Sequence, residues 1–440
     1  MTDKITVNNT LETLRHHILV DGYPVVVDLE KSHGSHLIDA QSGKKYFDFF
    51  SFFASNPIGF NHPKMNEPEF LRTLTRCARI KPVLSDVYTP EYAEFVDTFA
   101  RMGSKGHFTK YFFIEGGALA NENAMKAAFD WKVRKNLAKG KGEKGTKVIH
   151  FRHAFHGRSG YTMSLTNTDP RKTMYFPKFD WPRVMAHPAL KFPLTDTILK
   201  EVAEIEKKAI SEINEAFDKN PDDIACIIIE PIQSEGGDHH FRGEFLQLLR
   251  QICDQREALL IFDEIQTGTG LTGKFWAWEH FGVKPDLLTF GKKVQVCGVA
   301  TSERVNEVES VFRISSRINS TFGGNLTDMV RSTQFLKIIE SEKLDKNAAI
   351  QGEYILSQLT ELSKKYPQMT NIRGRGLLIA FDLPTTQERD NYRRKAWDLG
   401  LLVITCGEKS IRLRPVLNIS RAEVDEATSL FEATFKKLYS

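Results

Sequence analysis

Two apolar runs that end abruptly constrain the fold more than any other feature of this sequence. The first, 258–262, ends on Asp263, and the second, 285–290, ends on Gly291 and Lys292. Mostly apolar runs of this length are typical of strands that are buried on both faces of a parallel sheet. Neighbouring parallel strands would deliver Asp263 and Lys292 to the same edge of that sheet.

Three further apolar runs precede this pair, and helix-like segments separate them. The runs cover 110–114, 147–151 and 224–229, and clear helical patterns cover 197–219 and 241–255. Strands that alternate with helices predict an α/β fold with a mostly parallel central sheet. Ligands of such sheets bind beyond the carboxyl ends of the strands, so the residues found there define one expected crevice. These residues are Gly117, Phe155, Arg158, Glu230, Asp263 and Lys292.

The pattern changes after residue 325. Long helices are predicted over 326–342 and 347–366, and short β segments then lead to a final helix with a capping box of Ser420 and Glu423. Because 440 residues exceed what one hydrophobic core normally supports, we expect more than one domain. The expected parts are an N-terminal segment that packs with the small domain and a dimer interface (1–75), a large cofactor-binding domain (76–325) and a small α+β domain (326–440).

Composition argues against several classes of function. The net charge of +4 is small for 440 residues, and no apolar run is long enough to span a bilayer, so we expect neither nucleic-acid binding nor membrane insertion. The five cysteines are scattered without a Cys-x-x-Cys pair, which favours a reduced, cytoplasmic protein. The closely spaced His150, His153 and His156 alternate faces of an extended segment, and we therefore predict no metal site.

The acid and the amine at the sheet edge indicate a cofactor. Pyridoxal 5'-phosphate needs a partner for its protonated ring nitrogen and a covalent amine anchor, and Asp263 and Lys292 would supply both. Upstream, Gly116, Gly117 and Ala118 stand between a strand and a helix. Backbone N–H groups exposed there lie at the positive end of a helix dipole, which suits a phosphate group.

One glycine-rich stretch is a decoy. Residues 268–274 follow a strand and nearly match the nucleotide-binding P-loop. However, Phe275 occupies the position at which Ser or Thr must bind Mg²⁺, and we interpret the stretch as a turn.

An aromatic-dense segment, 46–57, is the other unusual feature of the N-terminal part. A lone aromatic stripe is more often core than a ligand cradle, so we assign it to the core. Its length also suits a covered subunit interface.

With these residues in view, the chain resembles the class III (ω-)aminotransferases, which are fold-type I enzymes that depend on pyridoxal phosphate. The resemblance extends from about residue 20 to the C-terminus, and its motifs stand in the order that the family has. Seven motifs in order make the resemblance specific, whereas one alone would be weak. The motifs are the glycine turn at 116–118, Phe155-His-Gly-Arg158, Glu230-Pro-Ile-Gln233, Phe262-Asp-Glu-Ile-Gln-Thr-Gly268, Gly291-Lys292, Ser320-Thr-Phe-Gly-Gly-Asn325 and Arg412-Leu-Arg-Pro415.

Within the class, the chain is most similar to the L-lysine 6-aminotransferase subgroup, through 115–120, 155–162, 176–182 and 291–298. The similarity implies a ping-pong transfer of the terminal (ε) amino group of L-lysine to 2-oxoglutarate. The products would be L-glutamate and 2-aminoadipate 6-semialdehyde, which cyclises to piperideine-6-carboxylate. Two alternatives stay open: another ω-aminotransferase, acting on ornithine or 4-aminobutyrate, and an aminomutase on the same fold.

The resemblance also implies roles around the cofactor. Lys292 would be the covalent anchor and proton carrier, whereas Lys293 would point away because side chains alternate along a strand end. Asp263 would pair with the ring nitrogen. Gly116 removes a serine hydroxyl that the class usually has, so phosphate binding would lean on backbone N–H groups and on Thr321 of a neighbouring subunit. The remaining contacts would come from Gln266 to the phenolic oxygen, Phe155 on the ring face, and Gly117 with Ala118 at the phosphate.

The expected substrates require a site that accepts both a long amine and a dicarboxylate. Arg158 is the candidate for the α-carboxylate of lysine, and Arg412 for that of 2-oxoglutarate, because a guanidinium binds carboxylates in a bidentate manner. Glu235 would neutralise Arg412 while lysine is bound and swing away for the keto acid. Asn319 is assigned to the far end of the substrate. The implied enzyme is a homodimer with shared active sites.

Overall fold

The computed structural model describes residues 4–439, and a seven-stranded sheet lies at its centre with the strand order β3-β11-β10-β9-β6-β4-β5. From β10 to β5 neighbouring strands pair in parallel, whereas β11 is antiparallel to both of its neighbours. The predicted mostly parallel sheet is confirmed, and β5 and β11 are the two strands of this sheet that the sequence patterns missed. The strands are β3 (Phe108–Ile114), β4 (Lys147–Phe151), β5 (Arg183–Val184), β6 (Ile224–Ile229), β9 (Leu259–Asp263), β10 (Leu287–Phe290) and β11 (Cys297–Ser302).

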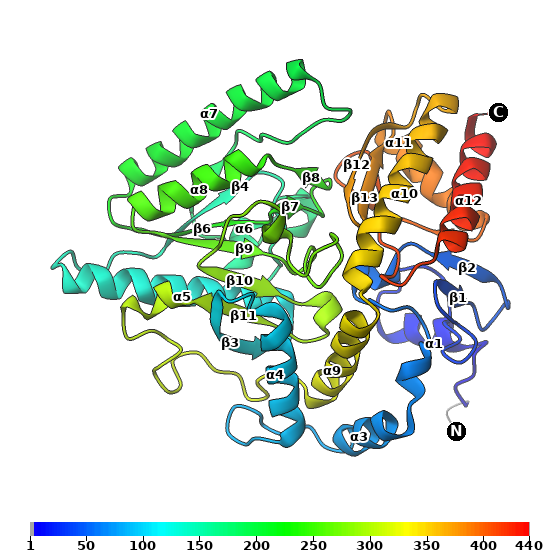
Figure 1. Ribbon diagram of the computed structural model, residues 1–440, viewed down its shortest axis with the longest axis horizontal. Helices are drawn as coiled ribbons and strands as arrows, with labels where there is room; N and C mark the ends of the chain where they lie inside the picture. The colour runs from blue at the N-terminus through cyan, green and yellow to red at the C-terminus, as the bar shows by residue number, and fades with distance from the viewer. Residues whose placement is uncertain (1–3, 440) are drawn as a thin grey trace.

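Helices cover both faces of this sheet (Figure 1). Along β9, Leu260 and Phe262 belong to the core formed with α7 (Asp196–Lys219) and α8 (Gly243–Gln255). The alternate residues Leu259 and Ile261 belong to the core formed with α5 (Gly117–Ala138). Burial on both faces explains why the sequence of this strand is apolar throughout residues 259–262 and does not alternate with polar residues.

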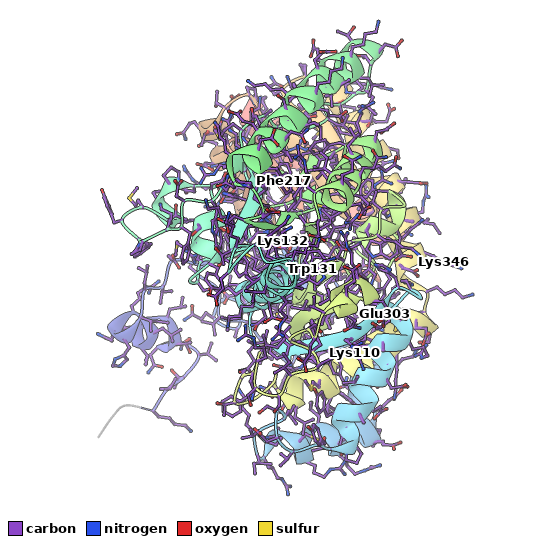
Figure 2. All side chains as sticks on the ribbon, turned by 90° about the vertical axis from the view of Figure 1, so that its left-hand side faces the viewer. Lys110, Trp131, Lys132, Phe217, Glu303 and Lys346 are labelled. Atoms are coloured by element: carbon purple, nitrogen blue, oxygen red, sulfur yellow. The ribbon has the colours of Figure 1, made fainter. Side chains whose placement is uncertain are left out.

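Small side chains let α5 lie close to the sheet. Ala120, Ala124, Ala127 and Ala128 are all buried in this helix, and Trp131 is buried further along it (Figure 2). The helix begins at Gly117, directly after the glycine turn that follows β3, as predicted. This arrangement points the N-terminus of α5 at the carboxyl edge of the sheet.

A four-stranded antiparallel sheet forms the C-terminal part, in the order β12-β13-β16-β15. Ser420 and Glu423 form the predicted capping box, since each backbone N–H donates to the other side chain. The strands are β12 (Thr370–Arg375), β13 (Leu378–Asp382), β15 (Ile404–Cys406) and β16 (Ser410–Leu413), and the helices are α10 (Leu344–Lys365), α11 (Thr386–Asp398) and α12 (Arg421–Tyr439).

The N-terminal residues attach to this C-terminal sheet region. Strand β2 (Lys45–Asp48) pairs with β1 (His36–Ile38) on one side and with β14 (Leu401–Leu402) on the other. Phe47 and Phe49 are buried in the same core as α10–α12. Helix α1 (Thr10–His17), in contrast, has no buried residue and stands away from the main body (Figure 2). The domain boundaries expected from the sequence stay a prediction.

The other helices pack beneath the large sheet or connect its strands. Helix α4 (Pro90–Gly103) packs against α9 (Leu326–Ser341), which also contacts α3 (Pro68–Ala78). A short helix, α6 (Thr162–Leu165), follows β4. No helix in residues 4–439 combines the length and the apolarity that a membrane crossing requires.

The glycine-rich stretch 268–274 is a turn, as predicted, and it contacts the C-terminal part. Leu271 O accepts a hydrogen bond from Leu377 N at 2.8 Å. Leu377 follows Gly376, which has φ +56° and lies so close to helix α10 that a Cβ on Gly352 would stand 2.0 Å from Gly376 O. Glycine is therefore needed at both positions for the helix and the turn to approach each other.

Gly352→Ala is expected to destabilise the protein by about 1–3 kcal/mol, because the new methyl group overpacks this contact. The sign is diagnostic, since alanine normally stabilises a helix interior by roughly 1 kcal/mol relative to glycine. Gly243→Ala in α8 is the matched control, because its Cβ would meet no atom closer than 3.8 Å. Thermal unfolding midpoints measure the effect, and equal midpoints for the two variants would contradict it.

Candidate active site

A cavity of about 600 Å³ lies beyond the carboxyl ends of the parallel strands. The structure brings most of the sequence-predicted site residues together there, while Asn319 and Thr321 are not among its lining residues. The predicted residues that line the cavity are Gly117, Ala118, Phe155, Arg158, Glu230, Glu235, Asp263, Gln266, Lys292 and Arg412.

Asp263 is buried at the end of β9, where three donors and the nearby hydroxyl of Thr289 surround its carboxylate. Asn121 Nδ2 and His156 Nδ1 donate to Oδ2 at 2.7 and 2.8 Å. The backbone N–H of Ile265 and the hydroxyl of Thr289 lie 3.1 and 3.3 Å from Oδ1. These bonds compensate for the removal of the carboxylate from water and fix its orientation toward the cavity.

Three of these partners were not found by sequence reasoning. Thr289 lies opposite Asp263 in the register of β9 and β10, and its hydroxyl also donates to Asn121 Oδ1 at 2.7 Å. Asn121 stands one helical turn after Gly117, a spacing that was readable in the sequence. His156 stands in the motif Phe155-His-Gly-Arg158, but sequence reasoning assigned it no role at the site. No group of three or more His, Cys, Asp or Glu between residues 4 and 439 could hold a metal ion.

Lys292 enters the cavity from a 3₁₀ turn rather than from a strand end. Strand β10 stops at Phe290, and residues Lys292–Val294 form the turn, in which Lys292 has φ +48°. A left-handed conformation is strained for a lysine and is a feature of functional positions. Burial, together with the Arg412 guanidinium, lowers the pKa of the Lys292 amine. A lowered pKa increases the fraction of neutral, nucleophilic amine.

Lys293 is separated from the cavity, but not by the strand alternation that we expected. Its fully buried amine donates to Gln266 O at 2.8 Å and to Ala54 O at 3.4 Å. Burial and the neighbouring Lys292 lower its pKa well below the usual value for lysine. Lys293 therefore acts as an internal tie between two loops.

One of these loops forms a wall of the cavity. The four residues Ser51–Ala54 (α2) all have positive φ, between 39° and 63°, so they make a left-handed turn. Each such residue costs roughly 1–2 kcal/mol, and the turn persists because side chains hold it from several directions. Phe52 and Phe53 line the cavity from this turn, so the assignment of the whole aromatic segment to the core was wrong for these two residues.

Side-chain hydrogen bonds besides those of Lys293 also hold the left-handed turn. Asp48 Oδ1 accepts from the N–H groups of Phe50 and Ser51 at 2.8 and 2.7 Å. The hydroxyl of Ser51 donates to Arg414 O at 2.6 Å. Gln266 Nε2 lies 3.4 Å from Phe53 O, which links the wall to a second residue of the cavity.

A carboxylate shared by two cations lies at the side of the cavity that faces the C-terminal sheet. Glu235 Oε2 accepts from Arg412 Nη2 at 2.8 Å, and Glu235 Oε1 accepts from Lys172 Nζ at 2.7 Å. Although burial opposes it, these two cations hold the pKa of Glu235 below its usual value. Lys172 also lines the cavity, and sequence reasoning missed it because no motif includes it.

Arg158, unlike Arg412, is not paired with a carboxylate of the described residues. It lines the cavity and is exposed, and no ion pair or hydrogen bond is found for its side chain within residues 4–439. A free guanidinium at the mouth of a cavity is available to a carboxylate ligand. Asn319 and Thr321 are exposed in the segment before α9, away from this chain's cavity.

Comparison with known proteins identifies the class. Residues 19–435 match the family "Aminotransferase class-III", and the chain belongs to this family. The family assignment confirms the resemblance seen in the sequence, and pyridoxal 5'-phosphate is the cofactor of this class.

Individual members of this family are similar to the chain over most of its length. The L-lysine-epsilon aminotransferase of Mycobacterium tuberculosis is 50% identical over 420 residues, which cover 94% of this chain and 93% of the relative. The mitochondrial 4-aminobutyrate aminotransferase of Sus scrofa is 32% identical over 416 residues, covering 88% and 80%. A solved structure of lysine aminotransferase from M. tuberculosis superposes with a TM-score of 0.96 at 47% identity and covers 99% of this chain and 100% of that one.

The residues present fit pyridoxal phosphate. The N-terminus of α5 opens onto the cavity, and no side chain of the described part of the protein caps it, which leaves backbone N–H groups for a phosphate. Gln266 Oε1 is buried without a hydrogen-bond partner, as a side chain that awaits a ligand would be. Asp263 and Lys292 supply the carboxylate and the amine that the ring requires.

Asp48→Asn is expected to gain stability relative to the wild type as the pH rises. Burial raises the pKa of Asp48 to about 6 from its usual 3.8, so the folded state keeps a proton that the unfolded chain loses. The stability of the wild type therefore falls between about pH 4 and pH 6 and stays lower above that range. Asparagine has no proton to lose, and its Oδ1 keeps both backbone bonds.

The difference in unfolding free energy between this variant and the wild type should shift by about 2–2.5 kcal/mol in favour of the variant between pH 4 and pH 7. Chemical denaturation at several pH values measures the shift. A difference that stays constant over this range would contradict the burial of an ionisable Asp48 beneath the turn.

Proposed function

We propose that this protein transfers the ε-amino group of L-lysine to 2-oxoglutarate and releases 2-aminoadipate 6-semialdehyde and L-glutamate. The observation that carries the proposal is the Glu235–Arg412 pair, which lies in the same cavity as Lys292. Such a pair can present a neutralised arginine to one substrate and a free arginine to another. The identity of 47–50% to lysine ε-aminotransferases supports lysine as the amino donor.

Bound pyridoxal phosphate would supply the electron sink that stabilises negative charge at the carbon next to the transferred nitrogen. Lys292 is the proposed covalent anchor, and its amine, when free, carries a proton from that carbon. Asp263 is proposed to hold the proton on the ring nitrogen, and its three donors keep it aimed there. The other proposed contacts are Gly117 and Ala118 at the phosphate, Phe155 on the ring face and Gln266 at the phenolic oxygen.

Each substrate has a proposed cation for its α-carboxylate. Arg158, which is free, would bind that of lysine, and Arg412 would bind that of 2-oxoglutarate after Glu235 moves away. While lysine is bound, Glu235 would stay on Arg412, so that no unpaired charge is left beside the long apolar stem of the substrate. Asn319 is proposed for the far end of the substrate.

Neither alternative is favoured by the geometry. An aminomutase needs no second keto acid, and the retained Glu235–Arg412 pair has no evident use in it. Ornithine and 4-aminobutyrate aminotransferases belong to the same class III family. They differ from a lysine aminotransferase in the chain length of the amine that they accept. The cavity wall formed by Phe52 and Phe53 is where that length would be limited.

A homodimer is the proposed assembly. Thr321 and Asn319 are exposed and do not reach the cavity of their own chain, so a second copy would be needed to bring them to a site. Helix α1 and the apolar side chains of Ile18 and Leu19 beside it are also left exposed by a single chain. A cytoplasmic location and the three-part domain division are proposed with it.

With 2-oxoglutarate as acceptor, kcat/KM for L-lysine should exceed that for ornithine by about 10-fold or more, since one methylene in a fitted pocket is worth roughly 1–3 kcal/mol. The substrate panel consists of lysine, ornithine and 4-aminobutyrate, and glutamate formation is the readout. A preference for either of the other amines would overturn lysine as the substrate. Turnover that persists without 2-oxoglutarate would instead favour the aminomutase.

Mixed dimers test the shared site. Lys292→Ala homodimers should be inactive, and Thr321→Ala homodimers should bind the cofactor about 10- to 100-fold more weakly, since a charge-assisted hydrogen bond is lost. A hybrid of the two variants should regain one site with wild-type cofactor affinity, because one Lys292 then faces one intact Thr321. Titration of each purified dimer with pyridoxal phosphate measures this, and a hybrid without a high-affinity site would contradict sharing.

A further inference from the structure

We infer that Lys172 is a positioning residue that retains Glu235 when Arg412 binds the carboxylate of the keto acid. The inference rests on the proposed function and deepens it, since it assigns the place to which Glu235 moves. Lys172 itself would touch neither substrate. It would act through Glu235, and only in the half of the reaction that uses the dicarboxylate.

The carboxylate of Glu235 is shared by two cations, one of which is more deeply buried than the other. Glu235 Oε1 lies 2.7 Å from Lys172 Nζ, and Oε2 lies 2.8 Å from Arg412 Nη2. The side chain of Arg412 is 3% exposed, whereas those of Lys172 and Glu235 are 25% and 29% exposed. Lys172 is therefore closer to solvent than Arg412 is, and because it binds the other carboxylate oxygen, a rotation of Glu235 away from Arg412 can keep the bond to Lys172.

A retained partner matters because a partly buried carboxylate is costly without one. If Arg412 were its only cation, Glu235 would have to lose its whole ion pair before the keto acid could bind. With Lys172 in place, Glu235 loses one of two bonds, so the state that binds the keto acid lies closer in free energy to the resting state. While lysine is bound, Glu235 stays on both cations, and this advantage has no effect.

Lys172 is held in position before any substrate arrives. It ends the 3₁₀ turn Pro170–Lys172, which Asp169 caps by accepting from Arg171 N at 2.9 Å. Its amine lies 3.4 Å from the hydroxyl of Thr168 and 5.3 Å from the centroid of the Phe155 ring. A lysine with these neighbours spends little conformational freedom when it binds Glu235 alone.

The test separates the two half-reactions of the purified holoenzyme. Lys172→Met should raise the apparent KM for 2-oxoglutarate by about 10-fold or more, because Glu235 keeps Arg412 in the resting state but has no cation left once it moves away from Arg412. The half-reaction with the amino donor should change by less than about 3-fold. Rapid mixing of each cofactor form with its substrate, followed by cofactor absorbance, gives both values. Lys172→Arg should restore the KM for 2-oxoglutarate.

Arg171→Met is the matched control. It removes a cation from the neighbouring position of the same turn, but the Arg171 side chain is 85% exposed and pairs with Asp169 rather than Glu235. This variant should leave the KM for 2-oxoglutarate near the wild-type value. An equal rise in both variants would show that only the general positive field of the loop matters, and it would overturn the inference.

A double variant tests whether Lys172 contacts the keto acid directly. When Glu235→Ala is already present, Lys172→Met should have no further effect on the half-reaction with 2-oxoglutarate. A persisting effect would show that Lys172 binds the keto acid itself, and an equal loss in both half-reactions would show a general role. Either result overturns the inference. If wild-type protein prefers another amine to lysine, the proposed substrate fails, but these comparisons stand with that amine as donor.

Discussion

The pairing of β9 with β10 is the constraint on which the site depends. Its parallel register sets Thr289 beside Asp263, and Lys292 follows three residues later. Because both strands end at the same edge, the acid and the amine reach one cavity without any long loop. A slip of one residue would turn Asp263 to the opposite face of the sheet and away from Asn121 and His156.

Charge compensation explains how so polar a cavity survives in the interior. Unpaired buried charges cost several kcal/mol each, and the residues here are paired across the junction between the two sheets. Besides the Glu235–Arg412 pair, Asp238 and Arg414 form a fully buried ion pair at 2.6 Å. Arg373 donates to Gly237 O at 2.6 Å in the same turn. The turn that carries Glu235 is thus anchored to the C-terminal sheet, and the cavity forms only when that sheet is in place.

Much of this arrangement was predictable from the sequence, for physical reasons. Buried parallel strands leave apolar runs, and the positions of β4 and β6 were predicted without error. The antiparallel β11 was missed, because Cys297–Ser302 contains small and polar residues and gives no such run. The site residues that end a strand or follow a glycine turn were predicted correctly to lie at the cavity, because the end of a strand and a glycine turn can both be recognised from the local sequence.

The contacts that orient those residues were harder to predict. Lys172 lies in a segment whose local pattern says nothing about the cavity, and only the tertiary structure brings it to Glu235. The left-handed turn was also invisible, because Phe52 and Phe53 do not favour positive φ. Strain that is stabilised by distant side chains contradicts local propensity, so a sequence pattern cannot report it.

Lys292 and Lys293 are adjacent and carry the same amine, but the backbone conformation allows only Lys292, the proposed covalent anchor, to reach the cavity. The strained residue is Lys292, and its conformation sends one amine into the cavity while the next is sealed among carbonyl oxygens. Neither amine can take the place of the other without refolding the turn. The pair therefore separates two tasks that one residue type can perform: the amine of Lys292 is open to a ligand in the cavity, and the buried amine of Lys293 holds the wall in shape.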